Sequence, residues 1–387
     1  MIGKASFGIG PVVLSMATNQ LDSYIQAKIW SLDAPDEAMQ LEKAYGLASG
    51  TVRQFRFVGP RRLAFSPNME RAISVMSSDF DIVHEHGIWT AISRVVNKWR
   101  LRTGGPTVIS PHGSLEPWAL RRSKWRKRLA LASYERHNLR NTSCLHALSQ
   151  SEARDFRKFG LCGPIAVIPN GIPESWLTAK GDGLSFRRRH GISNSVFVML
   201  FLGRITPKKG LPMLFRAMAR LKRKLGKWIL AVGGVEEFAH KRELISLMRQ
   251  LALEPYVKFV GPLYDQDKVD AFAAADLFVL PSLSEGAPIS ILEALGAGIP
   301  VLTTEASPWE DLLRYRCGWW TDISEQGIAD ALDDVFRQPK AALNEMGERG
   351  RVLVANSYTW KRIAAQTSAL YQWLLRGGSI PDFVMME

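Results

Sequence analysis

The stretch PSLSEGAPISILEALGAGIPVLTT, residues 281–304, decides the fold of the second half of this chain. It follows the apolar run LFVL at 277–280, which predicts a strand, and it leads into a helical pattern over 289–297. The loop between them therefore lies at the carboxyl end of a strand, where open α/β sheets bind ligands. Gly286 allows a ligand close to the backbone, and Pro288 suits the first helical position. The unpaired N–H groups of that helix start favour an anion such as a diphosphate.

Two carboxylates bracket this predicted helix start. Glu285 precedes the helix and Glu293 lies about a turn and a half inside it. Both can accept hydrogen bonds from sugar hydroxyls near bound phosphates. A purely structural interpretation is also open, in which Glu285 caps the helix and Glu293 is a solvated helix residue. The spacing of the two residues alone does not decide between these interpretations.

A second segment places cations at the end of another strand. GRITPKKG, residues 203–210, follows the apolar run 197–202 and precedes a helical pattern. It puts Arg204, Lys208 and Lys209 at the carboxyl edge of the sheet, where cations can neutralise a diphosphate. A basic helix entry on a basic protein is the plain alternative. An anion-favouring helix start and a cationic strand end in one half of the chain together favour a phosphate site.

Short apolar runs alternate with longer helical patterns along the whole chain, which predicts an α/β fold with parallel sheets. The predicted strands of the first half are 25–30, 52–57, 81–84, 107–110, 144–147 and 166–168. Those of the second half are 197–202, 228–232, 257–260, 277–280 and 300–303. Helices are predicted between them, among others at 211–225, 241–253, 266–275 and 289–297.

A chain of 387 residues is too long for one ordinary core and suits two domains. We predict an N-terminal domain over 1–175 and a C-terminal domain over 176–359, joined through the polar, Gly- and Arg-rich stretch 174–191. The last helical pattern, 360–375, is expected to pack back on the first domain together with the rest of 360–387.

Composition excludes several classes of protein. With 46% hydrophobic and 22% charged residues, the chain is globular rather than disordered. Its three cysteines lie far apart, which gives no disulfide framework and fits a reducing, cytoplasmic compartment. No apolar run is long enough to span a bilayer. The net charge of +13 indicates anionic partners, namely a membrane surface or phosphorylated small molecules, because no nucleic-acid recognition motif accompanies it.

Four segments together resemble retaining glycosyltransferase family 4, the glycosyl transferases group 1. They are PNGI at 169–172, FLGRITPKKG at 201–210, GPLY at 261–264 and the block at 281–301. The segments occur in the family's order, and the resemblance covers nearly the whole chain. It implies the GT-B fold, in which two Rossmann-like, doubly wound parallel-sheet domains face each other across a cleft. It also implies a nucleoside-diphosphate-sugar donor, UDP- or GDP-linked, on the C-terminal domain.

By this resemblance the cations and carboxylates have distinct partners. Arg204 and Lys209 are expected to bind the donor diphosphate. Glu285 is expected to contact the transferred sugar, and Glu293 the ribose hydroxyls. Lys208 matches less well, because the family's donor lysine directly precedes the glycine.

The same resemblance assigns three further donor contacts. The backbone of Gly286 and Ala287 is expected to lie against the phosphates, with Leu263 near the base.

In the first half, SPHGSLEPWAL at 110–120 begins at the end of a predicted strand, which places His112 at the inter-domain cleft. A lone histidine is more often a satisfied structural residue. The matching histidine of the family lies beside the donor sugar, so we favour a functional role for His112. The strand-end run HEHG at 84–87 is a second acceptor-side candidate. Its H-x-H spacing lacks a third ligand, so no metal site is predicted.

A strongly basic stretch with interleaved tryptophans, residues 121–128, follows His112. One interpretation is a solvated helix face, the usual position of a run of charges. The other is a patch attracted to an anionic membrane surface, where each basic residue contributes about 1 kcal/mol. Enzymes similar to the family often use lipid-linked acceptors, and both interpretations stay open.

The N-terminus departs from the family pattern. SFGIGPVVLSMA at 6–17 resembles the family's glycine-rich loop over the diphosphate and acceptor, with Gly8 and Gly10 in the loop, but almost no strand precedes it. Either the start codon is placed too far downstream, or the first sheet lacks its central strand. A gap in a parallel sheet leaves backbone groups without partners. We therefore expect this chain to be less stable than one extended upstream, with its activity left open.

The sequence thus predicts a retaining, metal-independent hexosyltransferase. Its expected acceptor is a glycan or lipid-linked molecule of exopolysaccharide or lipopolysaccharide synthesis, and its expected place is the cytoplasm or the inner face of the membrane. No DxD-like motif stands at a strand end. A nucleotide-sugar epimerase or hydrolase on the same scaffold, and a catalytically impaired sugar-nucleotide-binding protein, are the alternatives. A dinucleotide-dependent oxidoreductase is weaker, because GIGPVV at 8–13 lacks the third glycine and a full preceding strand.

Overall fold

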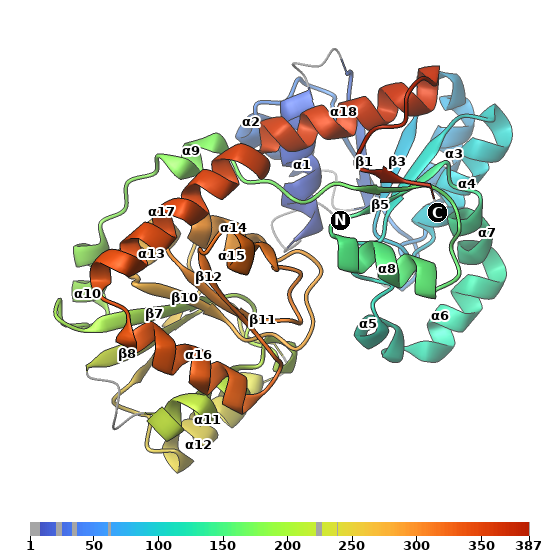
Figure 1. Ribbon diagram of the computed structural model, residues 1–387. Helices are drawn as coiled ribbons and strands as arrows, with labels where there is room; N and C mark the ends of the chain where they lie inside the picture. The colour runs from blue at the N-terminus through green and yellow to red at the C-terminus, as the bar shows by residue number, and fades with distance from the viewer. Residues whose placement is uncertain are drawn as a thin grey trace. The chain divides into compact units, whose positions relative to one another are not determined.

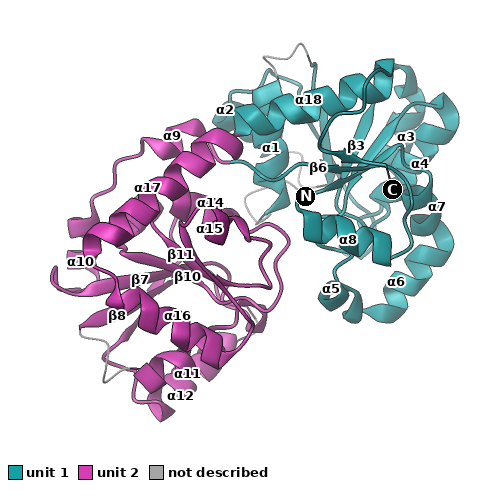
Figure 2. Cartoon of the chain, in the orientation of Figure 1, with its two compact units in different colours: residues 1–171, 360–387 teal, residues 172–359 magenta. Residues whose placement is uncertain are grey.

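A computed structural model describes residues 8–20, 25–32, 37–60, 63–221, 227–237 and 239–386 (Figure 1). The chain forms two compact units (Figure 2). Unit 1 comprises residues 1–171 and 360–387, and unit 2 comprises residues 172–359. Each unit is an α/β fold built on parallel strands.

Unit 2 contains one six-stranded parallel sheet in the order β12-β11-β10-β7-β8-β9. Its strands are β7 (Phe197–Leu202), β8 (Trp228–Gly233), β9 (Val257–Gly261), β10 (Leu277–Leu280), β11 (Val301–Thr304) and β12 (Gly318–Thr321). The helices are α9 (Glu174–Leu177), α10 (Gly183–Arg189), α11 (Leu211–Leu221), α12 (His240–Gln250), α13 (Asp265–Ala274), α14 (Ile289–Gly296), α15 (Asp311–Arg314), α16 (Glu325–Arg337) and α17 (Lys340–Ser357).

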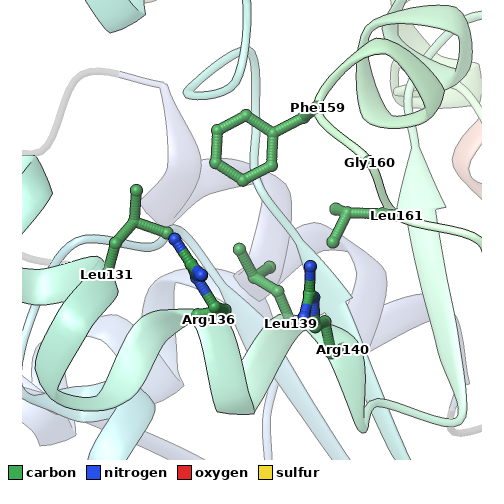
Figure 3. A pocket seen from close by; sticks show the side chains of 7 residues that line it. All are labelled: Leu131, Arg136, Leu139, Arg140, Phe159, Gly160 and Leu161. Carbon is green, nitrogen blue, oxygen red and sulfur yellow. The ribbon is translucent and has the colours of Figure 1, made fainter.

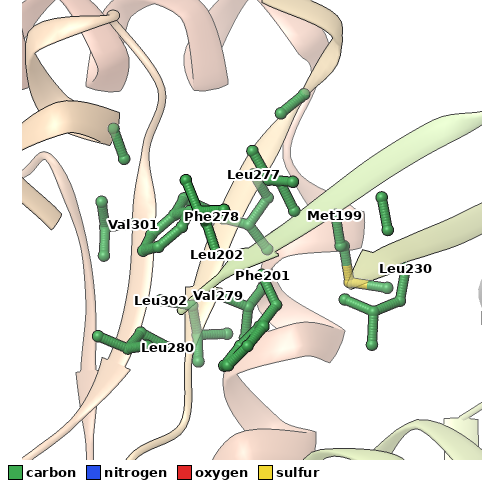
Figure 4. Packing of buried hydrophobic residues seen from close by; sticks show 14 of the residues in the cluster. Met199, Phe201, Leu202, Leu230, Leu277, Phe278, Val279, Leu280, Val301 and Leu302 are labelled. Carbon is green, nitrogen blue, oxygen red and sulfur yellow. The ribbon is translucent and has the colours of Figure 1, made fainter. Parts of the chain in front are cut away.

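The core of unit 2 lies on both faces of its central strands. Nearly every side chain of β7, β8 and β10 is buried, because helices cover the sheet on either side. Figure 4 shows these side chains interdigitating, with Phe201, Phe278 and Leu230 among them. Rigid packing of this kind fixes where each strand ends, and therefore where the loops that follow begin.

Unit 1 contains a five-stranded sheet in the order β13-β6-β5-β4-β3 and a separate two-stranded sheet of β1 and β2. Its strands are β1 (Ile29–Leu32), β2 (Val52–Phe55), β3 (Val83–His86), β4 (Thr107–Ser110), β5 (Cys144–Ala147), β6 (Ile165–Val167) and β13 (Val384–Met385). The helices are α1 (Ile9–Gln20), α2 (Ala38–Tyr45), α3 (Pro67–Val75), α4 (Ile92–Thr103), α5 (Pro117–Arg121), α6 (Lys124–Ala130), α7 (Arg136–Arg140), α8 (Gln150–Lys158) and α18 (Trp360–Arg376).

Two features of unit 1 bear on the sequence predictions. Helix α18 packs against α1 within this unit. We predicted that almost no strand precedes Gly8. This prediction falls on residues 1–7, which lie outside the described residues. No described helix is both long and apolar enough to cross a membrane.

Most predicted strands match the structure, and four of them (β4, β5, β7 and β10) have the predicted bounds. Strand β3 lies two residues later than predicted, and β1 begins at Ile29 rather than residue 25. Two short strands were missed. They are β12, with the sequence GWWT, and β13, which pairs antiparallel with β6.

The prediction of a linker at 174–191 is wrong. This stretch forms α9 and α10, and Phe186 of α10 is fully buried while α10 packs on α13. Its arginines account for the polar appearance of the sequence. Arg187 is itself buried and pairs with Asp276 at 3.2 Å, and its guanidinium also donates to the backbone oxygen of Ala274 at 2.7 Å.

Candidate functional site

The strand order of unit 2 reverses between β7 and β10. These strands are neighbours, yet the chain leads from β7 outward to β8 and β9, and from β10 outward to β11 and β12. Loops that leave such a pair diverge, which opens a crevice at the carboxyl ends of the strands where α/β proteins bind ligands. The loops concerned are residues 203–210 after β7 and 281–288 after β10, the two segments that the sequence singled out.

Backbone contacts hold these two loops together. The N–H of Leu283 donates to the carbonyl of Lys208 at 2.8 Å. Gly210 has a φ of +69°, and a Cβ there would lie 1.9 Å from the carbonyl oxygen of Pro281. Only glycine permits this close approach in the left-handed region. The hydroxyl of Thr304 donates to the carbonyl of Ser282 at 2.5 Å, which ties the second loop to β11.

Lys209 and Glu285 meet between the two loops. Lys209 Nζ lies 2.6 Å from Glu285 Oε1, and the two side chains are only 13% and 10% exposed. Ser282 Oγ donates to the same carboxylate oxygen at 2.5 Å, and the N–H of Glu285 donates to the carbonyl of Ala306 at 2.8 Å. A largely buried ammonium group is therefore held by a carboxylate that is itself fixed beside the start of α14. Glu285 does not cap that helix, because its carboxylate is engaged here.

Arg204 has a different environment at the same strand end. Its guanidinium pairs with Glu237 at 3.0 Å and is 53% exposed. Exposed pairs of this kind contribute little to stability, so the guanidinium can exchange Glu237 for another anion at small cost.

Glu293 is largely buried, so it is not the solvated helix residue that the structural interpretation described. Its side chain is 13% exposed and pairs with Lys268 Nζ at 2.6 Å. Burial raises the pKa of Glu293, while Lys268 opposes that shift. Lys268 also lies over the ring of Trp176, 5.0 Å from its centroid, and the indole N–H donates to the carbonyl of Glu293 at 2.7 Å. Lys268 is not among the residues predicted from the sequence, because it lies on another helix, α13.

The remaining predicted donor residues lie around this crevice. Gly286 and Ala287 are half-buried in the loop after β10, and Pro288 precedes α14 as its N-cap rather than forming its first turn. Leu263 is buried after β9, where a Cβ added at Gly233 would lie 3.0 Å from it.

In unit 1, Gly8 precedes α1 with a φ of +110°. We predicted that Gly10 lies in a loop, and this is wrong, because Gly10 is buried in the first turn of α1.

His112 lies directly after β4 with a positive φ of 52°, which is a strained conformation for a residue with a side chain. Its Nε2 is 2.9 Å from Nδ1 of His86, so the structure brings this residue together with the HEHG run. Burial, followed by the nearby His146, lowers the pKa of His112 to about 3, which keeps its ring neutral. Among the described residues, no group of three or more His, Cys, Asp or Glu side chains is arranged to hold a metal ion.

The basic stretch 121–128 forms parts of α5 and α6. All of its cations are exposed except Lys127, whose ammonium donates to the carbonyl of Ala119 at 2.6 Å and lies over the Trp89 ring. Trp125 and Leu129 are 63% and 61% exposed, and because they lie four residues apart they share one face of α6.

A pocket of about 270 Å³ lies nearby, between α7 and the loop after α8 (Figure 3). Leu139, Phe159 and Leu161 make its apolar wall, and Arg136 and Arg140 line it as well. The pocket contains none of the predicted site residues. It lies at the end of α7 that leads into β5, and so at the opposite edge of the sheet from His112.

Comparisons with known proteins agree with this architecture. Residues 184–352 match the family described as glycosyl transferases group 1, and residues 8–176 match glycosyltransferase family 4. The chain is 23% identical to an MMP alpha-(1->4)-mannosyltransferase of Mycolicibacterium hassiacum, over 94% of this chain and 87% of that protein. It is also 23% identical to a phosphatidyl-myo-inositol mannosyltransferase of Mycobacterium leprae, over 96% and 94%. With an uncharacterized glycosyltransferase of Methanocaldococcus jannaschii the identity is 28%, but the alignment spans only 54% of either chain.

Solved structures show the same fold. HepE of Anabaena, in complex with UDP-glucose, superimposes with a TM-score of 0.75 at 19% identity, over 96% of this chain and 97% of that chain. The two family matches follow each other along the chain and together leave few residues outside them. With its two Rossmann-like units, the chain therefore has the GT-B fold and belongs to glycosyltransferase family 4, the glycosyl transferases group 1.

Proposed function

We propose that the protein transfers a hexose from a nucleoside-diphosphate sugar, bound on unit 2, to a glycan or lipid-linked acceptor. The observation that carries this proposal is the Lys209–Glu285 pair at the point where the strand order of unit 2 reverses. A cation already held by a fixed carboxylate stabilises charge on a departing diphosphate with little reorganisation. The Anabaena structure was solved with UDP-glucose, a donor of this class, which supports a nucleotide sugar as the donor here.

We propose roles for the donor-side residues from the family resemblance, and their position at the crevice supports these roles. Lys209 and Arg204 bind the diphosphate, and the backbone of Gly286 and Ala287 approaches it at the start of α14. Glu285 accepts from hydroxyls of the transferred sugar. Glu293, positioned by Lys268, accepts from the ribose hydroxyls.

Four further residues complete the proposed site. Leu263 contacts the base of the nucleotide. Gly8 and Gly10, at the start of α1, approach the diphosphate and the acceptor. His112 hydrogen-bonds a sugar hydroxyl as a neutral ring.

We further propose that the reaction retains the anomeric configuration and requires no metal ion. The bond between the sugar C1 and the diphosphate oxygen breaks while the acceptor hydroxyl oxygen bonds to C1 on the same face. The hydroxyl proton passes to the departing phosphate oxygen, so no protein nucleophile is needed. Positioning and leaving-group stabilisation then supply the catalysis. The name of the Mycolicibacterium relative, an alpha-(1->4)-mannosyltransferase, supports a hexose as the transferred sugar.

A screen of nucleotide sugars tests the donor assignment. A bound donor raises the melting temperature by mass action, with about 2.7 kcal/mol of stabilisation at a concentration 100 times its Kd. We expect one or more UDP- or GDP-sugars to stabilise the protein, and the matching free hexose to have no effect. The nucleotide released with and without added acceptor, measured together with the products, then separates the alternatives. Acceptor-dependent release with an α-linked product supports transfer, whereas an epimerised or hydrolysed sugar would replace this proposal.

The acceptor is proposed to be a growing exopolysaccharide or lipopolysaccharide chain, reached at the inner face of the membrane. The exposed cations of 121–128, together with Trp125 and Leu129, support contact with an anionic lipid surface. The name of the Mycobacterium leprae relative, a phosphatidyl-myo-inositol mannosyltransferase, supports an acceptor at such a surface.

Vesicle binding tests this contact. Reversing the charge of Lys124, Arg126 and Arg128 to glutamate is expected to weaken binding to phosphatidylglycerol-containing vesicles at least about tenfold at low salt. Reversing Arg71, Lys98 and Arg102, which are exposed elsewhere on unit 1, is the matched control. Equal binding by both triple variants, or binding that does not depend on phosphatidylglycerol, would show that 121–128 is a solvated face.

A further inference from the structure

Four histidines and a tyrosine pack together at the carboxyl edge of the larger sheet of unit 1. His84 and His86 come from β3, His112 follows β4, His146 comes from β5, and Tyr371 comes from α18. Glu85 alternates to the other face of β3, so the cluster contains no carboxylate from that strand. The sequence indicated His112 and the HEHG run as separate candidates. In the structure, hydrogen bonds link them in one network, and the proposed function does not account for that network.

One end of the cluster is fixed by a backbone carbonyl. His146 Nε2 lies 2.7 Å from the carbonyl oxygen of Ile168, which can only accept, so Nε2 carries the proton. Burial lowers the pKa of His146 to about 4, so its ring is neutral and its Nδ1 has no proton. Nδ1 therefore accepts from Ser110 Oγ, which lies 2.6 Å away.

This assignment propagates to the next ring. Since the single hydroxyl proton of Ser110 points to His146, the Ser110 oxygen accepts from His84 Nε2 at 2.9 Å. The Nδ1 of His84 is then without a proton and accepts from the hydroxyl of Tyr371 at 2.7 Å. His84 Nε2 also lies 3.3 Å from His146 Nδ1, a donor facing an acceptor, as this arrangement requires. Burial and then the neighbouring histidines lower the pKa of His84 well below its ordinary value.

The second pair, His86 and His112, has no such anchor. The His86 ring stacks on that of His84, with centroids 4.2 Å apart, and one proton lies on the 2.9 Å contact to His112. Burial lowers the pKa of both rings, so both are neutral. Among the described residues, His86 Nε2 and His112 Nδ1 have no hydrogen-bond partner. Two arrangements therefore satisfy the pair equally: His86 donates to His112, or His112 donates to His86.

We propose that His86 is a positioning residue for His112, and that the tautomer of the pair follows the substrate. If a sugar hydroxyl donates to His112 Nδ1, His112 Nε2 donates to His86. If the hydroxyl accepts from His112 Nδ1, His86 donates to His112 instead. One proton arrangement satisfies the hydrogen bonds of His84, Ser110, His146 and Tyr371. Within the cluster, only the proton between His86 and His112 can therefore change its position. The strained φ of His112 is consistent with a ring held for contact rather than for packing. The inference rests on the proposed function for the identity of the substrate hydroxyl, but not for the hydrogen bonds themselves.

Nitrogen NMR on the full chain with ¹⁵N-labelled histidine tests the network without any substrate. The chain has seven histidines, so the imidazole signals are few. We expect His84 and His146 to be Nε2–H tautomers, and all four clustered rings to remain neutral from about pH 5 to 8. An Nδ1–H tautomer at His84 or His146, or protonation of any of the four within this range, would overturn the proposal.

Two variants of His86 then separate positioning from packing. Asparagine places an amide, which can donate or accept, near the position of His86 Nδ1, whereas leucine removes the hydrogen bond. We expect His86→Leu to shift the His112 signals and to lower kcat for turnover of UDP-glucose about tenfold with little change in KM, on the scale of one hydrogen bond. His86→Asn should restore most of both, and His137→Leu, at an exposed histidine, should leave the four clustered signals unchanged.

Unshifted His112 signals in His86→Leu, or equal defects in His86→Asn and His86→Leu, would refute the positioning role. If UDP-glucose is not turned over by the wild type, kcat is measured with the UDP- or GDP-sugar that stabilises it. If no such sugar is turned over, the donor assignment fails, and the NMR results still decide whether His86 holds His112.

Discussion

Lys209→Ala is expected to lower the rate of sugar transfer by about 10²- to 10³-fold, the cost of removing one fixed donor from a developing oxyanion. The ammonium of Lys209 is held 2.6 Å from Glu285, at 13% exposure, where the strand order of unit 2 reverses. A water molecule in place of the side chain would have to reorient as charge develops on the diphosphate. The substitution also leaves the Glu285 carboxylate without its cation, and an unpaired buried carboxylate repels an anionic donor.

The measurement is the initial rate of nucleotide release with the sugar nucleotide that stabilises the wild type, together with that donor's effect on the melting temperature. Lys227→Ala is the matched control, because Lys227 is an exposed lysine at the opposite, amino edge of the same sheet, directly before β8. Lys209→Arg keeps the charge but not the compact ammonium, so it should recover only part of the rate. Turnover by Lys209→Ala within a few fold of the wild type would remove this residue from the proposed site.

Much of the donor side was predictable, because the signals there are local. Strands β7 and β10 read as continuous apolar runs since both of their faces are covered, and the loops that follow them carry Lys209 and Glu285. What the sequence could not show is that these loops lie side by side. That depends on β7 pairing with β10, strands separated by about two βα units of chain. The Lys209–Glu285 contact is therefore a product of strand order.

Other parts of the fold and site had weaker signals. Glu293 pairs with Lys268, which lies on α13. The charged residues of this helix form no distinctive pattern, so the sequence gives no sign that Lys268 belongs to the site. Residues 174–191 look like a linker because they are polar. Arg187 can nevertheless be buried, because its guanidinium donates to backbone carbonyls. In unit 1, only the register of β3 with β4 brings His86 of the HEHG run beside Ser110, two residues before His112.

The buried acid pair behind β3 leads to the other large expected effect, on the pH dependence of stability. Glu85 and Glu135 are almost fully buried, and both contact the hydroxyl of Ser93, at 2.6 and 3.0 Å. One hydroxyl proton cannot serve two carboxylates, so the pair holds a further proton. Burial, and then the charge of Glu135, raise the pKa of Glu85 to about 8. Glu135 accepts from the N–H of Trp89 at 2.8 Å, which favours its ionised form and leaves the proton on Glu85.

Because the folded state binds this proton more tightly than the unfolded chain, the free energy of unfolding should fall as the pH rises from about 5 to 8 and then level off. Glutamine has no proton to lose at this position. The difference in unfolding free energy between Glu85→Gln and the wild type should therefore grow, in favour of the variant, by on the order of 3–5 kcal/mol between pH 5 and 9.

Urea denaturation of both proteins across this pH range measures the difference, and Asp81→Asn, at an exposed carboxylate just before β3, is the control expected to show no such trend. Parallel profiles for Glu85→Gln and the wild type would mean that Glu85 is ionised when folded. The proton of the pair would then lie on Glu135, whose pKa burial raises to about 7, although the N–H that Trp89 donates to Glu135 favours the ionised form there. A protonated Glu85 is thus the simpler account of the geometry, and it leaves β3 with a neutral acid on one face and neutral histidines on the other.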